Sequence, residues 1–199
     1  MRSSFFYSYF SFIFIMFIFI SACICIYFSI DKNIIFDHST NSFVTSSTFT
    51  TSSFLWPTPK YKQITSPFGY RISPTTGKKS FHGGIDIGAP KGSEVIASCS
   101  GIVKYTGFYS ANGFTVIISS NNYEFFYSHL SPDFIVSEGE QVIQGDVIGY
   151  VGPKNVYGVP NNPYKDSNGK PTNGSTTGPH LHFSIRKDGK AVNPLDYTQ

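Results

Sequence analysis

Short runs of β-branched and aromatic residues, separated by Gly, Asn and Pro, fill the sequence after Pro57. Such runs are typical of β-strands, and no stretch after Pro57 has the apolar spacing of an amphipathic helix. Asn121-Asn122 lies between two runs and predicts a tight hairpin turn, because asparagine tolerates a positive φ. The clearest runs are residues 94–97, 101–105, 114–119, 123–129 and 181–185. The sequence therefore predicts an all-β domain.

The N-terminus has a different character. Arg2 is the only charged side chain before Asp31, and residues 5–30 are mostly Phe, Ile, Tyr and Cys. At about 1.5 Å per residue, this stretch is long enough to cross a ~30 Å hydrocarbon core as a helix. We therefore expect residues 1–30 to form one N-terminal transmembrane helix, an uncleaved signal anchor.

A second reading of this segment is a lipoprotein signal. Residues 20–23, Ile-Ser-Ala-Cys, resemble a lipobox, which would leave the chain acylated at Cys23. The apolar run continues to Ile30, however, whereas a cleaved signal normally ends its apolar stretch at the cut. Arg2 and the terminal amine favour an N-terminus inside the cell. The expected location is the cell membrane, single-pass, with the β domain outside the cytoplasm.

Composition divides the rest of the chain in two. Eleven of the 25 residues in 31–55 are Ser or Thr, which predicts a linker, and residues 56–199 form the predicted domain. Cys99 is the only cysteine beyond the apolar segment, so the domain has no disulfide framework. A net charge of +3 without a basic run gives no sign of nucleic-acid binding. It modestly favours an anionic polymer such as a cell wall, although most such excesses serve only solubility.

Four of the five histidines fall in three short segments of the predicted domain: residues 81–86, 127–130 and 178–183. In a strand, His180 and His182 point to the same face, while Leu181 between them points to the other. Taken alone, each segment also has an ordinary structural interpretation. A His-x-His pair is weak evidence for a metal, and His129 at the end of an aromatic strand is typical of a hydrogen-bonded structural histidine.

Together, the three segments predict a catalytic metal site. Gly83-Gly84 permits a sharp bend that brings His82 and Asp86 together. Catalytic zinc takes three protein ligands and leaves a fourth position for water. His82, Asp86 and one member of the His-x-His pair form such a set, and two histidines remain beside it. An oxygen ligand suits zinc better than copper, although the spacing alone leaves other divalent metals open.

These segments resemble the M23 family of zinc endopeptidases, the lysostaphin or LytM type. The resemblance covers residues 66–197 and includes the family's His-x-x-x-Asp, Tyr-x-His-Leu and His-x-His motifs. Its most specific run is Thr-Gly-Pro-His-Leu-His-Phe at residues 177–183, and framing phrases match at residues 66–71, 88–92 and 139–152. The resemblance implies a twisted antiparallel β-sheet with a groove, and peptides of bacterial peptidoglycan as substrates.

The resemblance also implies a role for each residue. His82, Asp86 and His182 would hold one zinc ion, and His129 and His180 would be catalytic, beside the water that attacks the substrate. The family pattern leaves open which of the two histidines is the general base. Residues 153–177 depart from the pattern as an insertion rich in Asn, Pro and Gly. It forms either a wall of the substrate groove or a neutral surface excursion.

The function expected from the resemblance is zinc-dependent cleavage of peptidoglycan cross-bridges or stem peptides. The alternative is a membrane-anchored structural or interaction module of a sporulation complex at the engulfed forespore, which would use the same fold to bind a protein partner. A third interpretation, a lipoyl or biotin carrier, fails because no lysine lies in a suitable hairpin and four histidines stay unexplained.

Overall fold

The computed structural model describes residues 34–37, 42–45 and 54–199. The chain divides into two compact units, Met1–Ser52 and Ser53–Gln199. In the first, β1 (Ile34–Asp37) pairs antiparallel with β2 (Ser42–Thr45), inside the segment predicted as a linker. The predicted transmembrane helix, residues 1–30, lies outside the described residues. Among the residues that are described, no helix is long and apolar enough to span a membrane.

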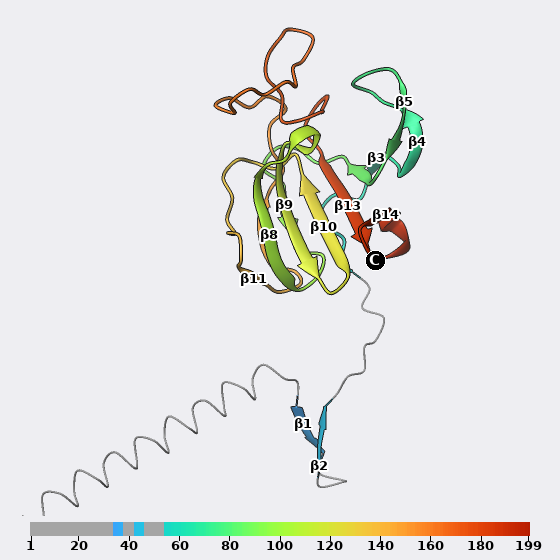
Figure 1. The fold of residues 1–199 in the computed structure, drawn as a ribbon, viewed down its shortest axis with the longest axis vertical. Coiled ribbons are helices and arrows are strands. Elements are labelled where there is room, and N and C mark those ends of the chain that lie inside the picture. The colour runs from blue at the N-terminus through green and yellow to red at the C-terminus, as the bar shows by residue number, and fades with distance from the viewer. Residues whose placement is uncertain (1–33, 38–41, 46–53) are drawn as a thin grey trace, which may run out of the picture. The chain divides into compact units, whose positions relative to one another are not determined.

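An antiparallel sheet of eight strands forms the centre of the second unit (Figure 1). Seven strands follow the order β11-β8-β9-β10-β13-β6-β3, and β14 pairs with the second half of β13. Their bounds are β3 (Ile64–Ser66), β6 (Ile85–Ile87), β8 (Gly101–Phe108), β9 (Phe114–Ser120), β10 (Tyr123–Ser128), β11 (Gln141–Val142), β13 (Leu181–Lys187) and β14 (Lys190–Val192). The predicted all-β antiparallel architecture is thus confirmed.

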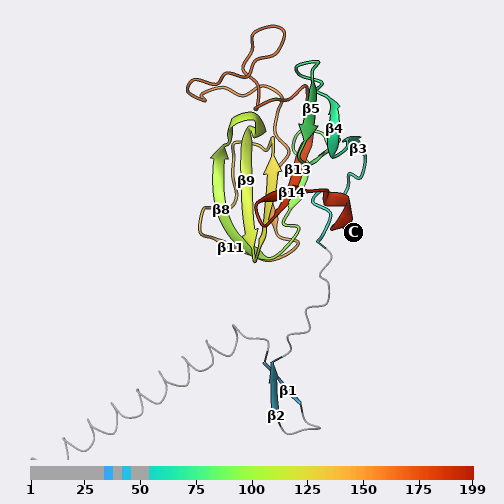
Figure 2. The ribbon, with the colours of Figure 1, turned by 45° about the vertical axis from the view of Figure 1, so that its right-hand side comes forward.

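Two further strand pairs and two single-turn helices complete the described part of this unit. The pairs are β4 (Gly69–Ile72) with β5 (Lys79–His82), and β7 (Glu94–Ile96) with β12 (Val147–Tyr150). The 3-10 helices are η1 (Ser110–Asn112) and η2 (Pro194–Asp196). The β4–β5 hairpin and the loop of residues 153–177, drawn in orange, lie at the same end of the sheet as the end of β10 (Figures 1 and 2).

Each of the five predicted runs corresponds to a strand, namely β7, β8, β9, β10 and β13, with ends that differ by at most three residues. Asn121 has a φ of 53°, so the asparagine pair does form the hairpin turn between β9 and β10. The β4–β5 hairpin has no counterpart in the sequence interpretation. Its apolar residues Tyr70, Ile72 and Phe81 are exposed and its other face is polar, so the two short strands show no apolar face packed on the core.

The core lies on one face of the central strands. Phe125 and Tyr127 of β10 pack with Phe183 of β13, and all three are fully buried. The rings of Tyr127 and Phe183 are 5.3 Å apart, and the Tyr127 hydroxyl accepts a hydrogen bond from the Ser98 amide at 2.7 Å. Each such burial contributes about 1.5–3 kcal/mol. Because side chains alternate along a strand, this packing holds the polar residues of β10 and β13 on the opposite face.

The chain joins this fold slightly earlier than the sequence indicates. The Phe54 amide donates to the Tyr197 carbonyl at 3.0 Å, and the Leu55 amide donates to the Ser98 carbonyl at 2.9 Å. The Phe54 ring packs edge-on against Phe125, with ring centroids 4.6 Å apart. Residues 54 and 55, which fall in the predicted linker, thus belong to the second unit.

Candidate active site

Strand register brings the candidate ligands together. His182 of β13 lies opposite Asp86 of β6 on one side and opposite Ser128, the last residue of β10, on the other. His82 ends β5, two glycines before β6 begins. Gly84 makes that short connection possible, because a Cβ at this position would lie 2.4 Å from the Phe183 carbonyl oxygen. His82 is thereby held beside the pair formed by Asp86 and His182.

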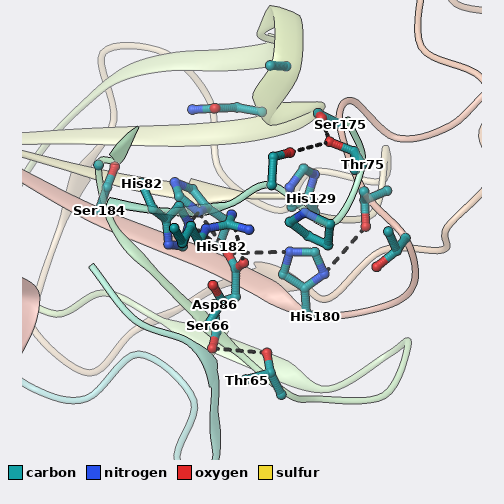
Figure 3. Close-up of a pocket in the computed structure, with 18 of the residues that line it drawn as sticks. Thr65, Ser66, Thr75, His82, Asp86, His129, Ser175, His180, His182 and Ser184 are labelled. Carbon is teal, nitrogen blue, oxygen red and sulfur yellow. Dashed lines mark hydrogen bonds and ion pairs between the residues drawn. The ribbon is translucent and has the colours of Figure 1, made fainter. Parts of the chain in front are cut away.

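Three ligand atoms converge at this point (Figure 3). The His82 Nε2 atom lies 2.9 Å from His182 Nδ1 and 3.2 Å from Asp86 Oδ1, and the last two atoms are 2.9 Å apart. Three ligands bound to one zinc ion at about 2.1 Å and tetrahedral angles lie roughly 3.4 Å apart. The two nitrogens and one oxygen therefore fit zinc in both chemistry and spacing, with one side left open.

Backbone carbonyls orient three of the four histidine rings. The Nδ1 of His82 lies 2.8 Å from the Pro67 carbonyl, that of His129 lies 2.7 Å from the Asn173 carbonyl, and that of His180 lies 2.9 Å from the Gly178 carbonyl. A carbonyl only accepts, so each Nδ1 carries the proton. In the neutral rings Nε2 then has the lone pair, which for His82 is the atom that faces the other two ligands.

The Asp86 carboxylate is the one acidic group of the cluster. Burial opposes its ionisation, but the contacts with the rings of His180, His182 and His82 outweigh that effect and hold the pKa of Asp86 well below its usual range. The guanidinium of Arg71 lies 3.5 Å from the second carboxylate oxygen, Oδ2. Asp86 is therefore ionised at neutral pH, which is the form that binds a metal cation.

His129 sits just beyond the end of β10 in an unusual backbone conformation, with a φ of 61°. Its ring lies 4.7 Å from that of His180 and 6.2 Å from that of His182, measured between centroids. Burial first, and then the two neighbouring histidines, lower the pKa of His129 to about 3. His129 therefore stays neutral at physiological pH, with Nδ1 protonated and Nε2 free to accept a proton.

A pocket surrounds the cluster, in agreement with the predicted groove. All four histidines and Asp86 line it, together with parts of the β4–β5 hairpin and residues 175–180. The hydroxyls of Thr75 and Ser175 lie 3.0 Å apart and join these two walls (Figure 3). The structure thus places all five residues singled out from the sequence around one opening.

A comparison with known proteins identifies the family. Residues 80–194 match the model of peptidase family M23. The chain belongs to this family. In this M23 chain, Asp86 and His182 lie on adjacent strands of one antiparallel sheet, and His129 follows the next strand, β10.

Two curated relatives of this M23 chain are peptidases by name. It is 38% identical over 136 residues to the DD-carboxypeptidase/endopeptidase Mpg of Neisseria meningitidis, which covers 68% of the chain and 27% of the relative. It is 32% identical over 136 residues to the peptidoglycan DD-endopeptidase ShyC of Vibrio cholerae, with coverage of 67% and 27%. The chain therefore spans about a quarter of the length of these relatives.

Solved structures share the M23 fold. A zinc containing peptidase from Vibrio cholerae matches with a TM-score of 0.55 and 29% identity, over 72% of this chain and 39% of the other. The SpoIIQ-SpoIIIAH pore forming complex matches with a TM-score of 0.55 at 23% identity, over 74% of this chain and 91% of the other. At that identity the second match shows the fold alone.

Only the end of the 153–177 insertion reaches the M23 pocket. Ser175, Thr176 and Thr177 line it, whereas the earlier residues of the insertion do not. Tyr157 is 70% exposed, and the Tyr164 hydroxyl lies 3.0 Å from that of Ser110 in η1. The part of the insertion that forms a wall of the groove is therefore short, and residues 153–174 lie outside the pocket lining.

Asn173 in this insertion is a site residue that the sequence interpretation missed. Its carbonyl accepts from His129, its Oδ1 accepts from the Phe114 amide at 2.8 Å, and its Nδ2 donates to the Leu130 carbonyl at 2.9 Å. It is fully buried. Asparagine is common in surface loops, and the contact to His129 uses a backbone atom, so no sequence signal marks this role.

Proposed function

We propose that the chain is a zinc-dependent endopeptidase that cleaves peptide bonds in bacterial peptidoglycan. The observation that carries the proposal is the convergence of three ligand atoms within 2.9–3.2 Å, beside two further histidines in an open pocket. The names of the relatives Mpg and ShyC support the reaction type, and the name of ShyC supports the substrate. His82, Asp86 and His182 would hold one zinc ion.

When bound, zinc lowers the pKa of a coordinated water to about 7 and polarises the scissile carbonyl. His129 is the better candidate for the general base, because its Nδ1 donates to the Asn173 carbonyl and its Nε2 is left with the lone pair in the neutral ring. Its free Nε2 can then take a proton from the attacking water. The orientation of the ring by a backbone carbonyl fixes the tautomer that this step needs.

His180 suits a different role. Its Nδ1 lies 2.9 Å from the Gly178 carbonyl, and its Nε2 lies 3.5 Å from Asp86 Oδ1. The ring lies at the edge of the pocket, where it would contact the carbonyl oxygen of the substrate. A hydrogen bond from this ring would stabilise the negative charge that develops on that oxygen as the bond is attacked.

Digestion of purified peptidoglycan tests the proposal. The full-length chain, purified in detergent and supplied with zinc, is expected to generate new amino termini and lower-mass fragments that mass spectrometry identifies. The His129→Ala and His180→Ala variants should retain zinc and lose this activity by a factor of about 100 or more. No fragments from the wild-type chain beyond those from these variants would overturn the peptidase proposal.

The rival function, a structural module that binds a protein partner in a sporulation complex, has less support. The match to the SpoIIQ-SpoIIIAH complex concerns the fold alone at 23% identity. A purely structural module has no need of a complete ligand set with two further histidines, all five of which are present here. The digestion experiment separates the two functions, since a structural module would release no fragments.

We further propose that residues 1–30 anchor the chain in the cell membrane and leave the peptidase domain outside the cytoplasm. The proposal rests on the apolar sequence of residues 5–30. After alkaline carbonate extraction, the full chain should stay with the membrane pellet, and a chain that begins at residue 34 should be released. Labelling with palmitate that depends on Cys23 would instead support the lipoprotein reading.

A further inference from the structure

Strand β13 carries a cationic side chain along the same face as the ligand cluster. His182, Ser184 and Arg186 alternate along this strand and all line the pocket. At about 3.3 Å per residue, the Cα of Arg186 lies roughly 13 Å along the strand from that of His182. The pocket therefore extends from the ligand cluster toward an exposed arginine that none of the steps above uses.

The guanidinium of Arg186 leans back toward the cluster. It lies 4.7 Å from the ring centroid of Phe126, a contact of the cation–π type. Phe126 belongs to β10 and is paired with Ser184, halfway between Arg186 and His182 in the register. The charged group is thus held above the floor of the pocket about two residues, or roughly 7 Å, from the row that contains His182.

No carboxylate neutralises this group within the described part of the chain. Glu124, which faces Arg186 across the strand pair, forms its ion pair with Lys104 instead. Among the side chains that line the pocket, Asp86 alone is acidic, and its oxygens face the histidines and Arg71. Arg186 therefore presents unused donors to whatever molecule lies in the pocket.

We propose that Arg186 is a specificity-determining residue that binds a free carboxylate of the substrate peptide, about two residues from the bond that is cleaved. An extended peptide rises about 3.3–3.6 Å per residue, so two residues span the distance from the ligand cluster to the guanidinium. The planar fork of arginine matches a carboxylate with two parallel hydrogen bonds. This inference rests on the proposed peptidase function and names the substrate class as anionic peptides.

Two cross-linked peptides that differ in one group provide the test. One carries a free side carboxylate two residues from the scissile bond, and the other carries a carboxamide there. With the full-length, zinc-loaded chain, the carboxylate peptide should have a KM roughly 10-fold lower than the carboxamide peptide. Arg186→Gln retains most of the side chain over Phe126 and should erase this preference through KM, with kcat and zinc content unchanged. Arg186→Lys should restore part of it.

Lys187 supplies a matched control. It is the neighbouring cation on β13, and its ammonium lies over the ring of Tyr123, which packs against the core side of the sheet. Lys187→Gln should keep the full preference. Equal KM values for both peptides in the wild-type chain would overturn the role of Arg186. An equal loss of the carboxylate preference in Arg186→Gln and Lys187→Gln would overturn it as well.

Direct binding separates this inference from the peptidase proposal. Calorimetric titration of the same two peptides into the zinc-loaded chain measures the carboxylate preference even if neither peptide is cleaved. If neither peptide is cleaved, but the wild-type chain prefers the carboxylate peptide in Kd and Arg186→Gln does not, the peptidase proposal is contradicted and the subsite is retained. Cleavage without any preference in Kd would contradict the subsite and retain the peptidase.

Discussion

Burial of a single imidazole ring gives the site a measurable pH dependence. The pKa of His129 in the folded chain is lowered to about 3, whereas an unfolded histidine titrates near 6.5. Below pH ~6.5 the unfolded chain therefore binds a proton at His129 that the folded chain does not bind. The contribution of His129 to stability is fully present above that pH and is lost as the pH falls toward 3.

We predict that the free energy of unfolding decreases between pH 7 and pH 5, with a slope from His129 of up to about 1.4 kcal/mol per pH unit. Denaturant titrations of the wild-type chain and of His129→Gln measure the difference. The glutamine variant should show the shallower slope. Because both chains keep His82, Asp86 and His182, metal loss at low pH affects them alike. Identical slopes would mean that His129 is not the buried neutral ring described above.

Asn173 is expected to position His129 for catalysis. In Asn173→Ala, the buried Phe114 amide and Leu130 carbonyl lose their partners, which should lower the free energy of unfolding by about 2–4 kcal/mol. The carbonyl that orients His129 then loses its fixed place, so kcat should fall while KM and zinc content stay constant.

The Asn173→Asp variant separates positioning from stability. Aspartate keeps the oxygen that accepts from the Phe114 amide, but its second oxygen replaces the Nδ2 that donates to the Leu130 carbonyl. The side chain therefore fills the same volume with one hydrogen bond lost. Its kcat should lie between those of the wild-type chain and Asn173→Ala. Steady-state kinetics and denaturant unfolding measure both effects. A kcat unchanged in both variants would show that Asn173 acts on the fold alone.

At the scale of elements, the connection between β5 and β6 determines the ligand geometry. A Cβ on Gly84 would lie 2.4 Å from the Phe183 carbonyl oxygen and 2.7 Å from Ser184 Cβ, both on β13. Gly84→Ala must therefore push β6 away from β13 and separate Asp86 from His182. We expect a loss of about 1–3 kcal/mol in stability and a zinc affinity weakened roughly 10-fold or more.

The adjacent glycine gives the control for this prediction. A Cβ on Gly83 would meet only the Ala191 Cβ, at an ordinary contact distance of 3.7 Å. Gly83→Ala should therefore bind zinc like the wild-type chain in a competition titration with a chelating dye. An equal loss of zinc affinity in both variants would mean that the flexibility of the glycine pair causes the effect, and not the contact of Gly84 with β13.

The 153–177 insertion divides into an outer excursion and a short inner part at the pocket. Asn155 pairs with Thr172, and the Val156 amide donates to the Pro171 carbonyl at 3.1 Å, so the two arms of the excursion already meet. Replacement of residues 157–170 by an Asn-Gly turn, which suits such a two-residue closure, leaves Asn173 and Ser175 in place.

We expect this shortened chain to keep its zinc content and its rate on a short peptide, because residues 157–170 do not line the pocket. Elemental analysis and a peptide cleavage assay measure the two quantities. Loss of cleavage with zinc retained would instead assign the excursion a direct part in substrate binding, as a full groove wall would require.

At the scale of the whole molecule, the sequence revealed those parts of the fold where burial leaves a pattern. Runs such as residues 114–119 and 181–185 predicted β9 and β13, because one face of each strand packs on the core. The β4–β5 hairpin was missed, since Tyr70 and Ile72 are exposed and its other face is polar. Periodicity reports burial, and this hairpin is stabilised mainly by cross-strand pairing.

The same limit applies to the site. Side-chain types and the family resemblance singled out the four histidines and Asp86, and the structure places all five around one pocket. The carbonyls of Pro67 and Asn173 orient His82 and His129 through backbone atoms, which no residue type reveals. Nothing in the sequence indicated a role for Arg186, because its position relative to His182 depends on strand register and on the contact with Phe126.

The division of the site into metal ligands and catalytic histidines is tested most directly by zinc per chain, measured by elemental analysis of the purified full-length protein. We predict about one zinc ion in the wild-type chain and in His129→Ala, and essentially none in His82→Ala, whose side chain supplies one of the three convergent ligand atoms. Equal zinc loss in His82→Ala and His129→Ala, or full zinc retention in His82→Ala, would contradict this division.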